Sequence, residues 1–221
     1  MKTLKTIINA VILLTAMTTL CSCDEHRDFP DTAIKTGHVL CTDGSVVPLD
    51  QCNATGRTPV AVVFHIFQGK DAEGTGYAVS LHDIQEKAFA DTIGVKQNTS
   101  ADLAAYDGNL NTHNLFITKD AVSPLAESVF TVWSYGQSAY IPSVAQMRML
   151  YQVKDIINPI IGQCGGEPIA DAPGECWYWT STEVKGQETT KAWLFSLGSG
   201  ALQETPKDQQ HKARPIITLY N

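Results

Sequence analysis

Three aromatic residues and a row of hydroxyl groups follow a cysteine in the segment CWYWTSTE, residues 176–183. A second aromatic segment, KAWLF, begins at residue 191, so that Trp177, Trp179 and Trp193 are three of the four tryptophans of the chain. Rings of this size either stack on a ligand or fill the core of a small domain. Whether these rings bind a ligand or fill the core depends on the strands and helices that position them.

Four cysteines could form disulfide bonds: Cys41, Cys52, Cys164 and Cys176. An exported chain enters an oxidising compartment, where an even number of cysteines favours disulfides. Pairing each cysteine with its neighbour closes two loops, CTDGSVVPLDQC and CGGEPIADAPGEC, whose Gly and Pro turns let the ends meet. Each bond would stabilise the fold by about 2–3 kcal/mol. A zinc site is the alternative, but the sequence has no C-x-x-C or H-x-x-x-H spacing to support it. We therefore expect two disulfides and no metal.

Other residues that could perform chemistry lack the pattern it requires. The segment DGNLN places Asp107, Asn109 and Asn111 at the first ligand positions of a calcium loop, but the Gly and Glu needed later are replaced by Thr112 and Thr118. No G-x-S-x-G segment marks a nucleophilic serine, and no P-loop or dinucleotide fingerprint occurs. We expect no enzyme activity and no cofactor, and an exported hydrolase is the least favoured interpretation.

The N-terminal segment is typical of a bacterial lipoprotein. Two lysines precede an apolar run over residues 7–20, which is too short for a membrane span and ends in small residues. The letters LCSC resemble a lipobox, so we predict a signal peptide over residues 1–22 and lipidation of Cys23, with a simple cleaved signal as the alternative. A charged segment over residues 23–36 then forms a flexible acidic tether.

This leader predicts where the protein acts. The acidic tether resembles the signal that sends lipoproteins of the Bacteroidota to the cell surface. We therefore expect an outer-membrane protein held by lipid alone and exposed at the surface, with the periplasmic face as the alternative. The formal charge of the whole chain is −7, and removal of the two leader lysines makes it more negative. Such a charge gives no attraction to nucleic acid.

The remainder, residues 37–221, has the pattern of one α+β domain. Apolar runs with turn signals predict strands over 37–49, 59–67 and 76–81, the run at 59–67 being buried on both faces. The middle of the chain has helical spacing, and strands return from residue 176 onward. Strands followed by helices and again by strands indicate an α+β fold, with mixed short strands and two main helices.

The clearest local signal is YIPSVAQMRMLYQVKDIINPIIGQCGG. Ser143 can cap a helix, and Gln146 three residues later completes a capping box. Apolar residues at positions 144, 147, 150, 151 and 153 then form one stripe that we assign to the core. Pro159 is expected to end or kink this helix.

Four segments over residues 140–216 resemble a known family. YIPSVAQMRML, YWTSTE, KAWLFSLGSG and KARPI occur in the order seen in the C-terminal domain family of the Legionella collagen-like adhesin, formerly a domain of unknown function. That family is similar to the C-type lectin-like fold, which also underlies formylglycine-generating enzymes. The resemblance implies a single C-type lectin-like domain. The cysteine context of those enzymes and the sugar–calcium tripeptides of true C-type lectins are missing, so neither activity is implied.

The resemblance also assigns the tryptophans. Trp179 and Trp193 match the two tryptophans of the family pattern, which implies that both are core residues. Trp177 matches no place in it, so the candidates for ligand binding are Trp177 and, on the opposite face of the strand, Tyr178.

The function expected from these observations is non-catalytic binding or adhesion at the cell surface, with a glycan or a protein as the partner. The alternatives are a structural subunit of a pilus or other surface assembly, and a hypervariable target protein of a diversity-generating retroelement.

Overall fold

A computed structural model describes residues 33–68, 74–134 and 137–220. The residues from Ile34 onward form one compact unit, and the side chain of Ile34 itself packs against the core. The expected signal peptide and Cys23 lie outside the described residues.

Five antiparallel strands form the first sheet, in the order β12-β4-β3-β1-β2. Their bounds are β1 Val39–Cys41, β2 Val46–Val47, β3 Pro59–Ile66, β4 Gly76–Ser80 and β12 Ile216–Leu219. The turn TDGS joins β1 to β2, as predicted, and β3 pairs with β4. The last strand of the chain, β12, therefore pairs with β4 from the first half of the chain, with Ile216 opposite Val79.

The second sheet has five strands in the order β10-β9-β8-β11-β5. Their bounds are β5 Ile84–Ala88, β8 Trp177–Glu183, β9 Lys191–Ser196, β10 Leu202–Pro206 and β11 Gln210–Ala213. The pair of β11 and β8 is parallel and the other pairs are antiparallel, so the sheet is mixed. A further pair of short strands, β6 Trp133–Ser134 and β7 Gln137–Ser138, lies apart from both sheets.

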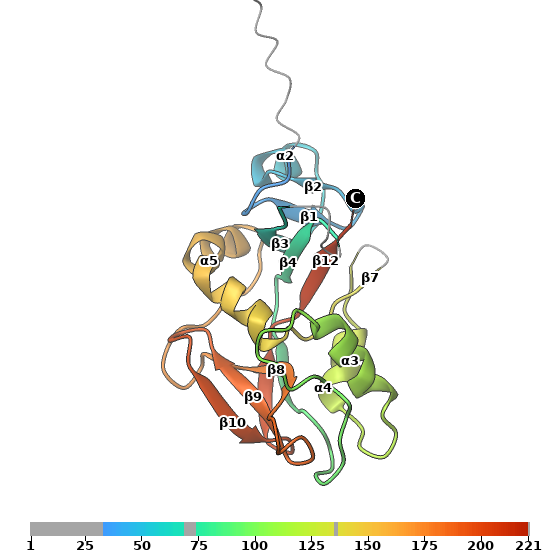
Figure 1. The fold of residues 1–221 in the computed structure, drawn as a ribbon. Coiled ribbons are helices and arrows are strands. Elements are labelled where there is room, and N and C mark those ends of the chain that lie inside the picture. Colours follow the sequence, from blue (N-terminus) through green and yellow to red (C-terminus); the bar gives the residue numbers. More distant parts are fainter. Residues whose placement is uncertain (1–32, 69–73, 135–136, 221) are drawn as a thin grey trace, which may run out of the picture. The chain divides into compact units, whose positions relative to one another are not determined.

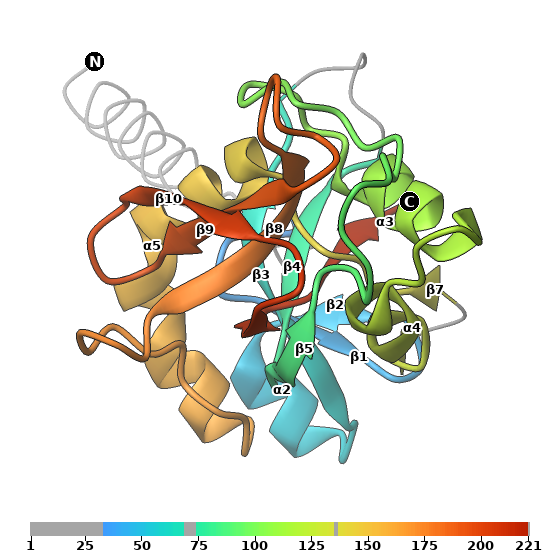
Figure 2. The same cartoon turned by 90° about the horizontal axis from the view of Figure 1, so that it is seen from below.

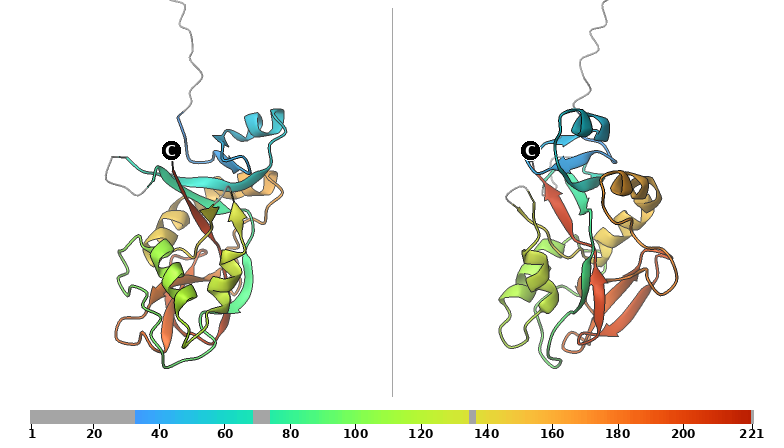
Figure 3. Two further views of the ribbon diagram at one scale, coloured as in Figure 1. Left: turned by 90° about the vertical axis from the view of Figure 1, so that its right-hand side faces the viewer. Right: turned by 180° about the vertical axis from the view of Figure 1, so that it is seen from behind.

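The described residues include four helices. These are α2 Leu49–Ala54, α3 Gly108–Ile117, α4 Pro124–Phe130 and α5 Val144–Gln163. Strands and helices together confirm the predicted α+β class. Helix α5 lies on one side of the strands, and α3 and α4 lie on the other (Figures 1 and 2). Figure 3 shows α2 with β1 and β2 at the end of this unit opposite to β8, β9 and β10.

Alternation along the strands divides the core into two clusters, one on each side. In β3, Val62 and Phe64 belong to the cluster that contains the buried face of α5, whereas Ala61 and Val63 belong to the cluster with α3 and α4. Successive side chains of a strand point to opposite faces. The prediction that this strand is buried on both faces is therefore confirmed for its central residues.

Helix α5 begins as the sequence predicts. The Ser143 Oγ accepts the Gln146 N–H, and the Gln146 side chain accepts the Ser143 N–H at 2.9 Å, which together make a capping box. Of the two outcomes expected at Pro159, an end of the helix is wrong, because α5 continues to Gln163, and a kink stays a prediction. Proline removes only the bond to the carbonyl four residues earlier, that of Asp155, which lies at an exposed position. Burial of Ile157 and Ile161 on either side of Pro159 holds the last turns in place.

Candidate functional site

Cys41 and Cys52 are neighbours in the structure. Their sulfur atoms lie 3.5 Å apart, with Cys41 on β1 and Cys52 on α2, and both residues are fully buried. Burial and the adjacent Cys52 thiol raise the pKa of Cys41 to about 11. A thiol with so high a pKa is a poor nucleophile at neutral pH. The two sulfur atoms lie too far apart for a disulfide, so both residues are free cysteines here, and the bond expected in the exported protein remains a prediction.

Cys164 and Cys176 are also free cysteines. Cys164 ends helix α5 and packs, partly buried, against the cluster that contains Cys41 and Cys52. The Cys176 sulfur lies 3.2 Å from the Ser196 Oγ. The structure therefore gives Cys176 a hydroxyl partner, and it joins none of the cysteines of residues 33–220 in a disulfide.

The aromatic residues of CWYWTSTE are mostly core. Trp179 is fully buried between Phe89 and His211, and its indole N–H donates to the Lys87 carbonyl at 3.0 Å. Tyr178 is also fully buried, on the opposite face with α5. The expectation that Tyr178 could stack on a ligand is therefore wrong, because both faces of β8 are covered.

The hydroxyls that follow are also structural. A β-bulge lies between Trp179 and Glu183, so the register with β9 shifts there. From this bulge the Thr182 Oγ1 accepts the N–H of Val144, the first residue of α5, at 3.2 Å. The Ser181 Oγ lies 3.4 Å from the Asn111 side-chain amide of α3. These contacts tie β8 to both helices.

Trp177 and Trp193 differ from these residues because each is only half-buried. Trp177 packs against the cluster with α3 and α4, whereas Trp193 packs against the cluster with α5. Trp179 thus lies in the core as expected. Trp193 packs against the core as well, but part of its side chain remains exposed. Its ring forms part of the wall of an open depression.

The depression beside Trp193 has a volume of about 750 Å³. We call it the Trp193 hollow; the residues that line it are Ala101, Asp102, Leu103, Val184, Lys185, Glu188, Trp193 and Glu204. They come from the segment before α3, the connection from β8 to β9, and strands β9 and β10. A volume of this size accommodates a small ligand or a few sugar units.

The charges of the Trp193 hollow are nearly balanced. Glu204 lies directly opposite Trp193 in the sheet and accepts from the Lys191 ammonium at 3.1 Å. Glu188 lies 3.8 Å from the Lys96 ammonium. Hydrogen bonds from the Gly186 N–H to Glu188, and from Lys191 and Gln187 to Glu204, lower the pKa of both carboxyls. Both are therefore ionised acceptors at neutral pH, with cations beside them.

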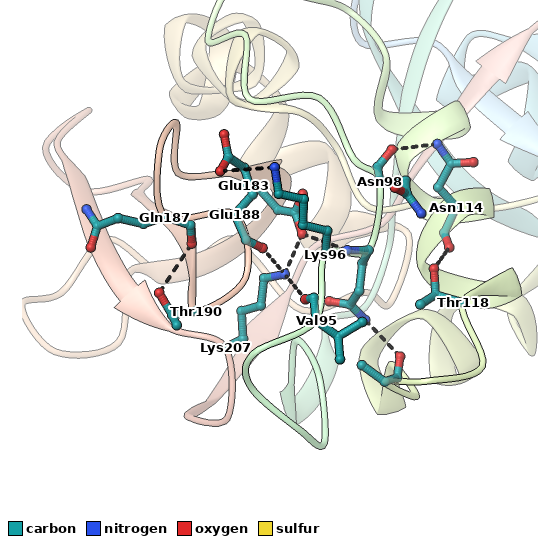
Figure 4. A network of polar contacts seen from close by, with 12 residues as sticks. Val95, Lys96, Asn98, Asn114, Thr118, Glu183, Gln187, Glu188, Thr190 and Lys207 are labelled. Atoms are coloured by element: carbon teal, nitrogen blue, oxygen red, sulfur yellow. Dashed lines mark hydrogen bonds and ion pairs between the residues drawn. The ribbon is translucent and has the colours of Figure 1, made fainter.

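A fully buried ion pair lies behind the hollow. The Lys207 ammonium contacts the Glu183 carboxylate, and both side chains are almost completely shielded from solvent. Lys207 also donates to the Glu188 carbonyl at 2.6 Å (Figure 4). Burial lowers the pKa of Lys207, while the Glu183 carboxylate opposes that shift. The contacts with carboxylate and carbonyl oxygens favour the charged form of the lysine.

A second buried pair holds the KARPI segment. Arg214 donates to the Asp83 carboxylate at 2.9 Å and to the carbonyls of Ser80, Leu81 and Glu167. The same carboxylate lies 3.3 Å from the Lys212 ammonium and accepts the Tyr178 hydroxyl. Each polar group in this network has a partner, so it fixes the junction between the two sheets and offers no free group for chemistry.

Two polar residues of the segment DGNLN, Asp107 and Asn111, form structural hydrogen bonds. The Asn111 side-chain amide donates to the Asp107 carboxylate at 2.8 Å, and its carbonyl oxygen accepts the Ser100 N–H at 2.9 Å. Within the part of the chain that the structure describes, no cluster of three or more His, Cys, Asp or Glu side chains could hold a metal ion.

A second depression is formed by the start of α3 and the residues just before it. It has a volume of about 620 Å³, and Tyr106, Asp107, Asn109, Leu110 and His113 line it. The Tyr106 ring is 59% exposed and is not held against the core, unlike Trp193. The Trp193 hollow is therefore the better-organised candidate site.

Sequence reasoning missed the polar residues of the Trp193 hollow and the pair behind it. Glu183 stands at the end of TSTE, and Lys207 follows a proline in a turn-like stretch, 24 positions away. No signal in the sequence pointed to this pair, because the residues on either side of Glu183 are mostly polar, as the letters TSTEVKG show.

No protein-family model matches the chain, and no curated protein matches it either. No helix among the described residues combines the length and apolar composition that a membrane span requires.

Proposed function

We propose that the protein is a non-catalytic recognition protein that binds a glycan in the Trp193 hollow. The observation that carries this proposal is the combination of a fixed tryptophan ring with paired carboxylates and ammonium groups around one depression. A pyranose ring has an apolar C–H face, which packs on an aromatic ring, and hydroxyls at its rim, which both donate and accept hydrogen bonds.

The balance of charge favours a neutral sugar over a cationic ligand. An aromatic ring with unpaired carboxylates would attract an ammonium group. Here the carboxylates of Glu188 and Glu204 already have Lys96 and Lys191 as partners. Carboxylates held in this way accept short hydrogen bonds from hydroxyl groups.

We further propose a C-type lectin-like fold for the domain, in agreement with the resemblance of residues 140–216 to the Legionella adhesin family. Three features support it: the capped helix α5, the pair of β8 and β9 with Trp179 and Trp193, and the buried arginine before Pro215. An adhesive role at the outer-membrane surface, through a lipid on Cys23, completes the proposal.

A glycan array with the chain from Asp31 onward tests the binding step. The wild-type protein should bind a defined set of neutral glycans. Trp193→Ala should weaken that binding by about thirtyfold or more, because an aromatic anchor contributes about 2 kcal/mol or more. Trp177→Ala is the matched control, since it removes a half-buried tryptophan from the neighbouring strand. Loss of binding in the control alone would move the site to Trp177, and a wild-type protein that binds no glycan would refute the proposal.

Replacement of Cys23 by alanine tests the anchor. The variant should leave the membrane fraction and appear in the soluble fraction or the medium, because a lipid on Cys23 is the proposed attachment. A variant that still requires detergent for extraction would contradict the lipid anchor.

A further inference from the structure

The Lys207 ammonium is surrounded by three oxygen atoms. They belong to the Glu183 carboxylate, the Glu188 carbonyl at 2.6 Å and the Val95 carbonyl at 3.5 Å. An ammonium group has three N–H donors, so each donor has its own acceptor. The Phe89 ring, whose centroid lies 5.3 Å from the ammonium, covers it further. Figure 4 shows the lysine side chain reaching between the segments that carry Val95 and Glu188.

These oxygens come from the segments that form the Trp193 hollow. Glu188 lines the hollow itself, and Glu183 directly precedes Val184 and Lys185, which also line it. Val95 begins the segment that continues to Ala101 and Leu103 on the opposite wall. The ammonium therefore joins both walls from behind.

Backbone hydrogen bonds extend the same connection. The Gln97 N–H donates to the Glu183 carboxylate at 3.1 Å, and the Glu183 N–H donates to the Ser100 carbonyl at 3.3 Å. The Gly94 N–H donates to the Thr189 carbonyl at 2.7 Å. The segment before α3 is thus held to the connection from β8 to β9 by groups that Lys207 and Glu183 organise.

An ion pair of this kind contributes little net stability. Removing two charges from water costs about as much as their attraction returns, and apolar residues of the same volume are often as stable. What apolar residues cannot supply is direction, since three hydrogen bonds to separate segments are satisfied in only one arrangement of those segments. Retention of the charges is therefore better explained by the positions that they fix.

We propose that Lys207 and Glu183 are positioning residues of the Trp193 hollow. Their ion pair holds the two walls at the separation that the ligand requires, and the hollow loses its shape without it. The effect on ligand affinity rests on the proposed glycan function, but the effect on the two wall segments does not.

The test compares the full-length chain with Lys207→Met, with the double variant Lys207→Met/Glu183→Leu, and with Lys154→Met. Lys154 is the matched control, because it is a buried lysine of α5 that pairs with Asp155 and Asp171 and does not line the hollow. Removal of one charge leaves the other buried without a partner, so Lys207→Met should melt at a clearly lower temperature. The double variant should recover most of that loss.

Hydrogen exchange distinguishes a local change in the two wall segments from a loss of stability of the whole fold. In the double variant, amides of residues 94–100 and 184–190 should exchange on the order of tenfold faster than in the wild-type protein, while amides of α5 and β3 keep their protection. Affinity for any glycan identified on the array should fall in parallel. The control should leave exchange in both wall segments unchanged.

A double variant with wild-type exchange in both wall segments would overturn the proposal, and so would equal acceleration in the Lys154→Met control. Should the wild-type protein bind no glycan while exchange changes as expected, the proposed glycan function fails and the positioning role stands.

Discussion

The two five-stranded sheets differ in the side chains that they bury. The first sheet, β12-β4-β3-β1-β2, buries almost only apolar side chains, and Ser80 and Thr218 are its buried polar residues among the described strands. The second sheet buries a run of polar side chains at the end of β8, namely Thr180, Ser181, Thr182 and Glu183.

This difference indicates that the two sheets have different roles in the same compact unit. Apolar packing stabilises a sheet without favouring one detailed arrangement of its loops. Buried polar groups stabilise only the arrangement in which every donor meets an acceptor. The first sheet therefore acts as the scaffold, and the second sets the geometry of the Trp193 hollow.

The largest expected effect separates two tryptophans of the second sheet, Trp179 and Trp193. Trp179→Ala should cost about 3–5 kcal/mol, because it removes a fully buried ring together with its hydrogen bond to Lys87. Trp193→Ala should cost about 1–3 kcal/mol, since part of that ring already faces the hollow. Thermal and urea unfolding measure both. Equal losses would remove the distinction between core and surface rings.

The second expected effect concerns the junction of the sheets. Arg214→Met should cost about 3–5 kcal/mol or somewhat less, because it leaves the Asp83 carboxylate buried with only Lys212 as its cation. A Phe64→Leu variant in the first sheet gives the comparison, and should cost about 1.5 kcal/mol or less as an apolar exchange. Unfolding free energies that reverse this order would contradict the division between apolar and polar sheets.

A smaller effect concerns the cysteines of the first sheet. In protein exported by its host, a Cys41–Cys52 bond should add about 2–3 kcal/mol, which reduction would remove. Peptide mapping without reductant should recover this pair. The same map tests the expected Cys164–Cys176 pair, which competes with the contact between Cys176 and Ser196. Free thiols at both Cys41 and Cys52 would refute the first bond.

The smallest expected effect is a dependence of the stability on pH. Each sheet contains one histidine whose protonation contributes to it. Burial lowers the pKa of His65 in β3 and of His211 in β11 below the ordinary value of 6.5. The unfolded chain therefore binds protons more readily, so stability is full above pH 6.5 and decreases as the pH falls below it. Melting temperatures between pH 7.5 and 5.5 should fall less in His65→Gln and in His211→Gln than in the wild-type protein. A wild-type melting temperature that rises on acidification would contradict the sign.

The sequence predicted the elements whose signals are local. The capping box of α5 needs only Ser143 and Gln146, three positions apart, and strand β3 is marked by its own apolar residues. Strands β5 and β11 were missed because their residues, IQEKA and QHKA, are mostly polar and their pairing depends on each other. Helix α2 was missed because its 6 residues, LDQCNA, are too few to show a helical period.

The candidate site could be predicted only in part. Trp193 was assigned to the core from its match to the family pattern, but its exposed side depends on how Glu204 and the segment before α3 pack around it. The contact between Lys207 and Glu183 joins residues that only the folded chain brings together. Neither residue carries a sign of its partner in the sequence around it.

The pairing of β12 with β4 has a consequence for the order in which the chain can fold. Strand β4 has β3 on one side from early in the chain, but its other neighbour consists of residues 216–219. Contacts between residues so distant in sequence close large loops, which makes folding slow. The first sheet therefore cannot be completed while the chain is still being synthesised or passing through a translocation channel. Such a delay is compatible with the export that the N-terminal segment predicts, because the late arrival of one strand would keep the chain from folding before it has crossed a membrane.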